Sequence, residues 1–185
     1  LFLIMKKVIL GATGSIGSSL AKKLAASGEE LHLVGRDETS LSSLAEDFLN
    51  GAPSAMILGD NIFFGHGLPE MLRAANERFD KSTIFGYHVA DPERYGVLGF
   101  NQTGAVKTII EKPDLPQSNY AVTGLYFLDG TAPKRAKNLK PSARGELEIT
   151  SLLETYLKDG NLYVEKMGNG YAWLDTGTHA SLLDA

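Results

Sequence analysis

MILGDNIFFGH, residues 56–66, joins a short apolar run to a carboxylate and sets the predicted fold. Residues 55–58 are apolar and short enough to form a buried strand, which Gly59 ends. Asp60 then lies at the carboxyl end of that strand, where open α/β sheets bind their ligands. An aspartate there suits a divalent cation that prefers oxygen ligands, such as magnesium. The alternative is a turn in which Asp60 and Asn61 are partners, because both are common turn residues.

Length and composition fit one globular domain. The chain has 185 residues, of which 43% are hydrophobic, so it can bury a core. A net charge of -4 argues against a nucleic-acid partner, because phosphate binding needs clustered lysine and arginine. The sequence has no cysteine, which excludes disulfides and cysteine-ligated metals and fits a cytoplasmic location.

The two ends of the sequence have unusual patterns. Residues 1–5 are apolar but too short for a signal peptide or a membrane span, so no membrane partner is expected. A start on leucine and a predicted helix that only begins at residues 178–185 are the pattern expected of a fragment. A homo-oligomer is possible, and the sequence does not decide it.

The first third of the chain has the pattern of strand, glycine loop and helix. Gly11, Gly14 and Gly17 form the loop, where the glycines and the free N–H groups of the helix start can hold a pyrophosphate. Arg36 follows the second strand, where a cation pairs with a 2′-phosphate, which favours NADP over NAD. The alternative is a glycine loop that only makes a tight turn.

Residues 5–55 resemble the opening of the short-chain dehydrogenase/reductase superfamily, which implies an NADP site at the glycine loop. That family also needs a tyrosine with a lysine four residues later. No tyrosine in this sequence has one: Tyr156 is followed by Lys158, and Tyr163 by Lys166. Neither spacing is the four-residue spacing that the family uses, so we do not expect dehydrogenase chemistry.

From residue 56 the sequence resembles another family, the glucose-1-phosphate thymidylyltransferases. The resemblance covers residues 56–185 and is carried, in order, by LGDNIFFGHGLPE, YHVADPERYGV, IIEKP, SNYAVTGLYF, LKPSARGELEIT and GYAWLDTGTHASLL. It implies the reaction of dTTP with glucose 1-phosphate to give dTDP-glucose and pyrophosphate. Two anions must be brought together in such a transfer, so the site needs a metal and fixed cations.

The resemblance assigns catalytic roles to three residues. Asp60 and Asp175 become the magnesium carboxylates, and Lys112 binds the sugar phosphate. Each aspartate follows an apolar stretch and precedes a turn. For Asp175 the alternative is a helix cap or an Asx turn in the sequence Asp-Thr-Gly-Thr.

Further residues are assigned to substrate binding by the same resemblance. Glu111 binds a sugar hydroxyl, and Arg144 binds a phosphate. The positions that line the sugar pocket are Tyr95, Gly96 and Val122. The alternatives are a solvated Glu111–Lys112 pair, a turn at Gly96, a core position for Val122 and an exposed loop cation at Arg144 that pairs with Glu146. Trp173 is interpreted as a packing residue.

The resemblance ends at the first loop. The family has a glycine-rich signature with an arginine, followed by proline and lysine, whereas residues 10–17 read LGATGSIG. We therefore expect a join near residues 51–58 between a segment 1–55 and a segment 56–185, and impaired turnover. The alternatives are an NADP-binding protein without the catalytic tyrosine and lysine, or an inactive chimeric binding module.

The predicted fold class is α/β, with strands that include residues 31–34 and 106–110 and helices at about residues 40–50 and 146–158. We expect a Rossmann-like three-layer α/β/α sandwich with a mixed, mainly parallel sheet, as in the nucleotide-diphospho-sugar transferases. The two segments have no flexible linker between them, so their strands are expected to fuse into one sheet.

Overall fold

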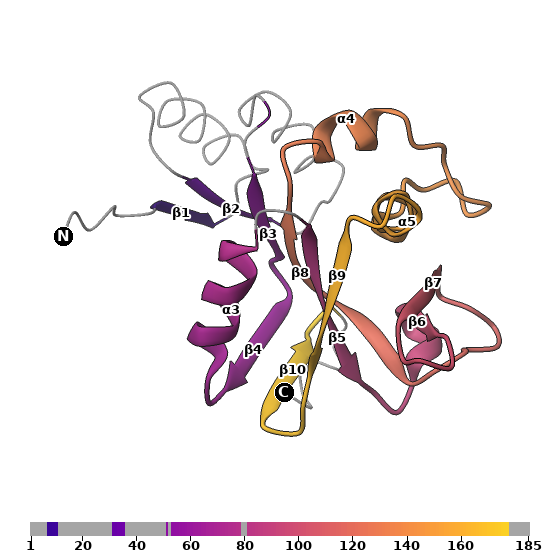
Figure 1. The fold of residues 1–185 in the computed structure, drawn as a ribbon, viewed down its shortest axis with the longest axis horizontal. Coiled ribbons are helices and arrows are strands. Elements are labelled where there is room, and N and C mark those ends of the chain that lie inside the picture. Colours follow the sequence, from indigo (N-terminus) through magenta and orange to yellow (C-terminus); the bar gives the residue numbers. More distant parts are fainter. Residues whose placement is uncertain (1–6, 11–30, 36–50, 52, 79–80, 178–185) are drawn as a thin grey trace.

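A mixed sheet of eight strands forms the centre of the computed structural model, which describes residues 7–10, 31–35, 51, 53–78 and 81–177 (Figure 1). Six strands follow each other across the sheet in the order β1 (Lys7–Leu10), β2 (Leu31–Gly35), β3 (Ser54–Leu58), β8 (Tyr120–Leu128), β5 (Ser82–His88) and β9 (Leu162–Met167). Only β8 runs against the other five. The prediction of a mixed, mainly parallel sheet is confirmed.

Two further strands extend the sheet beside β8. β6 (Gly96–Phe100) pairs antiparallel with β7 (Val106–Glu111) and contacts β8 through Val97 and Ala121. A 3₁₀ turn, η1 (Pro92–Arg94), leads into β6. This extension brings the end of β7 next to the middle of β8, and it positions the residues described below.

Helices cover both faces of the sheet, as the three-layer prediction requires. α3 (Leu68–Glu77) turns Ala75 and its partly buried neighbours toward Phe85, Leu125 and Met167. α4 (Ala132–Lys137) and α5 (Ile149–Lys158) cover the other face. There the core contains Ile84, Leu98, Ile109, Val122, Tyr126, Leu152, Leu153 and Tyr156. Neighbouring residues of β5 thus face opposite helix layers, because side chains alternate along a strand.

A separate ribbon of two strands closes the lower part of the fold in Figure 1. β4 (Asn61–Gly65) pairs antiparallel with β10 (Tyr171–Asp175), with Asn61 opposite Asp175. The backbone N–H and the hydroxyl of Thr176 both donate to the carbonyl oxygen of Asp60, at 2.8 and 2.9 Å. The sequence predicted the strand before Asp60 but not this ribbon.

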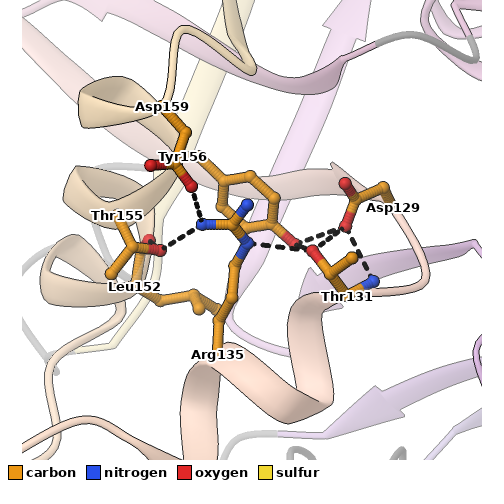
Figure 2. A network of polar contacts seen from close by, with 7 residues as sticks. All are labelled: Asp129, Thr131, Arg135, Leu152, Thr155, Tyr156 and Asp159. Carbon is orange, nitrogen blue, oxygen red and sulfur yellow. Dashed lines mark hydrogen bonds and ion pairs between the residues drawn. The ribbon is translucent and has the colours of Figure 1, made fainter.

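A network of polar contacts holds α4, α5 and the end of β8 together (Figure 2). Asp129 Oδ1 accepts hydrogen bonds from the Tyr156 hydroxyl at 2.8 Å and from the Thr131 hydroxyl and backbone N–H at 2.6 and 2.8 Å. Arg135 donates to Thr131 and pairs with Asp159 at 2.7 Å, and its guanidinium lies 4.2 Å from the centre of the Tyr156 ring. The C-terminal half of α5 is therefore fixed by polar groups that satisfy each other.

The strands predicted at residues 31–34, 55–58 and 106–110 agree with β2, β3 and β7 to within a residue, whereas the helix predicted at about residues 146–158 begins at Ile149, as α5. The predicted helices at 40–50 and 178–185 lie outside the described residues. β1 and β2 belong to the same hydrogen-bonded sheet as β3 and β8. In the part of the chain that is described, no helix is both long and apolar enough to cross a membrane.

Candidate active site

One pocket lies where β3, β7, β10 and the start of α5 meet the middle of β8. Its walls are Leu58, Asp60, Asn61, Arg94, Tyr95, Gly96, Glu111, Lys112, Val122, Gly124, Tyr126, Ile149, Thr150, Trp173 and Asp175. Seven of the predicted site residues are among them. The volume of about 170 Å³ lies below the range of pockets for drug-sized ligands, so the pocket suits a small polar molecule.

Asp60 and Asp175 enter the pocket side by side, because the ribbon register places them at its end. Asp60 Oδ2 and Asp175 Oδ1 both lie within 3.1 Å of one point, the position that a Cβ would take at Gly177. A pair of neighbouring carboxylates fits magnesium, which is commonly held by one or two carboxylates and completes its shell with water and substrate phosphate. No group of three or more histidine, aspartate or glutamate side chains with metal-site geometry occurs among the residues described.

The turn alternatives for both aspartates are also present in the structure. Asp175 Oδ1 accepts a hydrogen bond from the backbone N–H of Gly177 at 2.9 Å, which is an Asx turn. Asp60 Oδ1 accepts one from the side-chain amide of Asn61 at 2.9 Å. These contacts orient the carboxylates, and their role toward a metal stays a prediction.

Glu111 and Lys112 reach the same pocket because the backbone changes conformation between them. Glu111 is the last residue of β7, and Lys112 has φ of 40°, the only positive value among the non-glycine residues described. Consecutive strand residues would point to opposite faces. The left-handed conformation of Lys112, held by its N–H bond to Tyr95 O at 2.9 Å, brings its Nζ to 3.9 Å from Glu111 Oε1.

The environment of Glu111 disfavours its charge. Burial raises the pKa of this carboxyl, and the neighbouring Glu148 carboxylate raises it further. A hydrogen bond with Thr150 and the charges of Lys112 and Arg144 act in the opposite direction without cancelling the burial. Glu111 is thus an acceptor with few strong partners, directed into the pocket.

An aromatic wall faces the charged groups. The Tyr95 ring lies 5.2 Å from that of Trp173, and burial raises the pKa of the Tyr95 hydroxyl. Gly96 is a buried strand residue and not part of a turn, and a Cβ there would meet the Thr150 methyl at 2.5 Å. Val122 is buried in β8 and still reaches the pocket. Trp173, which sequence reasoning treated as a packing residue, lines the site as well.

Arg144 lies beside the pocket but not in its wall. Its guanidinium is half-exposed and lies among three carboxylates, at 3.3 Å from Glu146, 3.6 Å from Glu148 and 3.9 Å from Glu111. The buried Glu148 also accepts a hydrogen bond from the Ser142 hydroxyl at 2.9 Å. The predicted pairing with Glu146 is therefore present, and so is proximity to the pocket.

Sequence reasoning missed several pocket residues. Asn61, Arg94, Gly124 and Thr150 lie within the segments that carry the resemblance, but no role was assigned to them there. Thr150 is the second residue of α5, so its approach to Gly96 depends on the packing of that helix. Membership of those segments is the signal that could have indicated all four.

The glycine loop residues Gly11, Gly14, Gly17 and Arg36 lie outside the described residues. The NADP site predicted there stays a prediction, and so does the division at residue 55. The comparisons with known proteins support neither the NADP site nor the join. The family model that matches this chain describes nucleotidyl transferases and begins at residue 37, upstream of the predicted join.

The nucleotidyl transferase family model matches residues 37–185. The glucose-1-phosphate thymidylyltransferase of Xanthomonas campestris is 60% identical over 142 residues, which are 77% of this chain and 48% of that protein. The enzyme of that name from Neisseria meningitidis is 49% identical over 142 residues, 77% of this chain and 49% of its own length. The chain thus spans about half the length of these curated relatives.

Solved structures share the fold. A Bacillus anthracis protein assigned as a glucose-1-phosphate thymidylyltransferase and crystallised with sucrose has a TM-score of 0.68 and 36% identity, covering 90% of this chain and 69% of that one. An apo UDP-glucose pyrophosphorylase has a TM-score of 0.69 at 20% identity, covering 91% and 67%, and this likeness concerns the fold alone. With the family model matching more than half of its residues, the chain belongs to the nucleotidyl transferase family.

Proposed function

We propose that the pocket binds a sugar 1-phosphate, and that the chain catalyses nucleotidyl transfer of the glucose-1-phosphate thymidylyltransferase type. The substrates would be glucose 1-phosphate and dTTP, and the products dTDP-glucose and pyrophosphate. The observation that carries the proposal is the convergence of Asp60, Asp175, Glu111, Lys112 and Tyr95 on one small pocket. The names of the relatives support the choice of substrates.

In this reaction a phosphate oxygen of the sugar phosphate bonds to the α-phosphorus of the triphosphate. The bond from that phosphorus to the bridging oxygen breaks, and pyrophosphate leaves with the electron pair. Asp60 and Asp175 would hold magnesium, which when bound neutralises charge on the phosphates. The carboxylate pair thereby fixes the place where the triphosphate is expected to bind.

Lys112 would hold the sugar phosphate. Its ammonium group is half-exposed and has Glu111 as a distant partner at 3.9 Å, too far for a hydrogen bond. It can therefore bind phosphate without first losing a strong contact. Arg144, which lies among three carboxylates, would bind the same phosphate, because a guanidinium can hold a phosphate through two N–H groups.

Glu111 would accept hydrogen bonds from sugar hydroxyls. Its carboxylate is mostly buried and has little access to water, so a bound sugar hydroxyl would supply a hydrogen bond that water does not. Tyr95, Val122 and Trp173 would enclose the apolar faces of the sugar ring. The pocket thus offers an acceptor, a cation and an apolar wall at neighbouring positions.

Isothermal titration calorimetry with glucose 1-phosphate tests the sugar half of the proposal. We expect Lys112→Ala to weaken binding by about 1.5–3 kcal/mol, the usual loss of a charge-assisted hydrogen bond. Lys158→Ala on α5, whose side chain is 74% exposed, is the matched control and should bind like the unmodified protein. Absence of heat at millimolar ligand would reject the sugar-phosphate site.

Pyrophosphate release with dTTP, glucose 1-phosphate and magnesium tests the transfer itself, and Asp175→Asn should abolish it. We expect turnover below that of family members that carry the glycine-rich signature, since residues 10–17 lack its arginine. Loss of one preorganised donor typically costs roughly 10²–10³ in rate. Turnover equal to that of such an enzyme would contradict this expectation while leaving the sugar site intact.

A further inference from the structure

Asn61 connects three structural elements through one side-chain amide. Its oxygen accepts a hydrogen bond from the backbone N–H of Gly124 in β8 at 2.9 Å and from the indole N–H of Trp173 in β10 at 2.6 Å. Its nitrogen donates to Asp60 Oδ1 at 2.9 Å. The amide thus lies between the main sheet, the ribbon and one of the two carboxylates that converge in the pocket.

Chemistry fixes which way this amide points. The backbone N–H of Gly124 and the indole N–H of Trp173 can only donate hydrogen bonds. The side-chain oxygen of Asn61 must therefore face them, and its NH₂ group must face Asp60. In the reversed orientation, the NH₂ group of Asn61 would face the N–H groups of Gly124 and Trp173, and its oxygen would face the Asp60 carboxylate without a hydrogen to donate.

The fixed amide also fixes the rotation of the Asp60 carboxylate. Oδ1 is the oxygen bound to Asn61. Oδ2 lies 3.1 Å from the position that a Cβ would take at Gly177, and Asp175 Oδ1 lies 3.0 Å from the same position. One oxygen of Asp60 is thus held by the amide, and the other lies beside Gly177, as Asp175 Oδ1 does.

Gly124 provides the space for this arrangement. A Cβ at that position would lie 2.6 Å from the Asn61 oxygen and 2.7 Å from its nitrogen, closer than side-chain atoms approach. A residue with a side chain in this part of β8 would displace the amide. The contact therefore depends on a glycine in a buried strand, where glycine is otherwise unfavourable.

We propose that Asn61 is a positioning residue for the cation site, which orients Asp60 so that its second oxygen faces Asp175. This inference rests on the proposed function, because it assigns a cation to the Asp60–Asp175 pair. Hydrogen-bond partners of metal-binding side chains commonly orient them, and their mutation typically costs 10–100-fold in metal affinity. Asn61 acts through Asp60 and need not contact the metal.

Binding of Mn²⁺, followed by electron paramagnetic resonance in the absence of substrates, tests the inference. We expect Asn61→Ala to weaken Mn²⁺ binding by about 10-fold or more. Trp173 is the only tryptophan in the sequence, so its indole N–H gives a single resonance in a nitrogen–proton correlation spectrum. Asn61→Ala should shift that resonance upfield, because the short hydrogen bond to Asn61 is lost.

Gly124→Ala is a second variant that moves the same amide without deleting it. It should weaken Mn²⁺ binding and shift the indole resonance in the same direction. Asn119→Ala is the matched control, because the side-chain amide of Asn119 also donates a hydrogen bond, to the carbonyl oxygen of Val89, but lies outside the pocket wall. The control should change neither measurement.

The outcomes separate this inference from the proposed function. The cation assignment in the proposed function is wrong if the unmodified chain does not bind Mn²⁺, or if Asp60→Asn and Asp175→Asn leave its Mn²⁺ binding intact. If it does bind Mn²⁺ and Asn61→Ala binds equally well, the positioning role is wrong and the proposed function stands. A shifted indole resonance with unchanged Mn²⁺ affinity would also overturn it, since Asn61 would then only anchor Trp173.

Discussion

Helix α5 has a polar cluster at each end, and the two clusters are built in opposite ways. At its C-terminal half, Asp129 Oδ1 accepts three hydrogen bonds from Tyr156 and Thr131 within 2.8 Å (Figure 2). At its start, the Glu111 carboxylate has two cations no closer than 3.9 Å. Buried polar groups that are satisfied internally stabilise a fold, whereas poorly satisfied ones cost stability and remain available to a ligand.

The pKa values of the two carboxyls follow this difference. Burial alone would raise the pKa of Asp129, but the hydrogen bonds from Thr131 and Tyr156 outweigh it, and the pKa is lowered. Burial dominates at Glu111, and its pKa is raised. Burial also raises the pKa of Tyr156 to about 12, so its hydroxyl stays a donor at neutral pH. One cluster thus favours its charge and the other does not.

The largest expected effect is on the stability of the fold, through the cluster around Asp129. Asp129→Ala should lower the free energy of unfolding by about 3 kcal/mol, because the buried Tyr156 hydroxyl and the Thr131 donors lose their acceptor. Urea denaturation followed by circular dichroism measures this. Asp175→Asn in the pocket is the counterpart and should change the free energy by less than about 1 kcal/mol. Equal losses in both variants would remove the contrast between the clusters.

Lys112 provides a smaller and more specific test, because its φ of 40° is unfavourable for any residue but glycine. Lys112→Gly should raise the free energy of unfolding by about 1 kcal/mol and weaken glucose 1-phosphate binding as strongly as Lys112→Ala. Denaturation and calorimetry on the same samples give both values. If Lys112→Gly were less stable than Lys112→Ala, the pocket would store no backbone strain at this residue.

The smallest effect is on the pH dependence of stability, and it has opposite signs at the two clusters. The ordinary pKa of glutamate is 4.5 and that of Glu111 is raised, so the folded state binds the proton more tightly. Stability then falls as pH rises from about 4.5 through the raised value. Glu111→Gln should therefore be more stable than the unmodified protein at neutral pH, and this advantage should disappear in acid.

Asp129 should behave in the reverse manner. Its pKa is lowered from 3.8, so its contribution is present above that value and is lost as pH falls through the lowered one. Asp129→Asn should therefore lower the free energy of unfolding most at neutral pH and least in strong acid. Urea denaturation of both variants between about pH 3 and pH 8 decides the matter, and parallel profiles would contradict the assigned pKa directions.

The sequence predicts the elements with a strong local pattern. Residues 55–58 are a short apolar run ended by glycine, residues 106–110 are ended by Glu-Lys-Pro, and both segments form strands close to the predicted bounds. The ribbon was not predicted, because Ile62 and Phe64 in β4 are exposed and its partner lies about a hundred residues later. Local periodicity does not report a pairing that tertiary contacts create.

The same limit applies to the site. Asp60 and Asp175 could be singled out because each follows an apolar stretch, whereas Glu111 and Lys112 were assigned by the family resemblance. Thr150 could not, since its place depends on how α5 packs against Gly96. The reach of Lys112 depends on a left-handed backbone conformation that the sequence Glu-Lys-Pro does not specify by itself.

The pairing of β4 with β10 also has a consequence for the order of folding. Asn61 and Asp175 lie opposite each other although they are far apart in the sequence, so this contact closes a long loop. Contacts of that kind form slowly, because the chain entropy of loop closure must be overcome first. A nascent chain released before β10 would carry Asp60 without its partner. Completion of the pocket then coincides with the arrival of β10, and a cation bound there would stabilise that step by mass action.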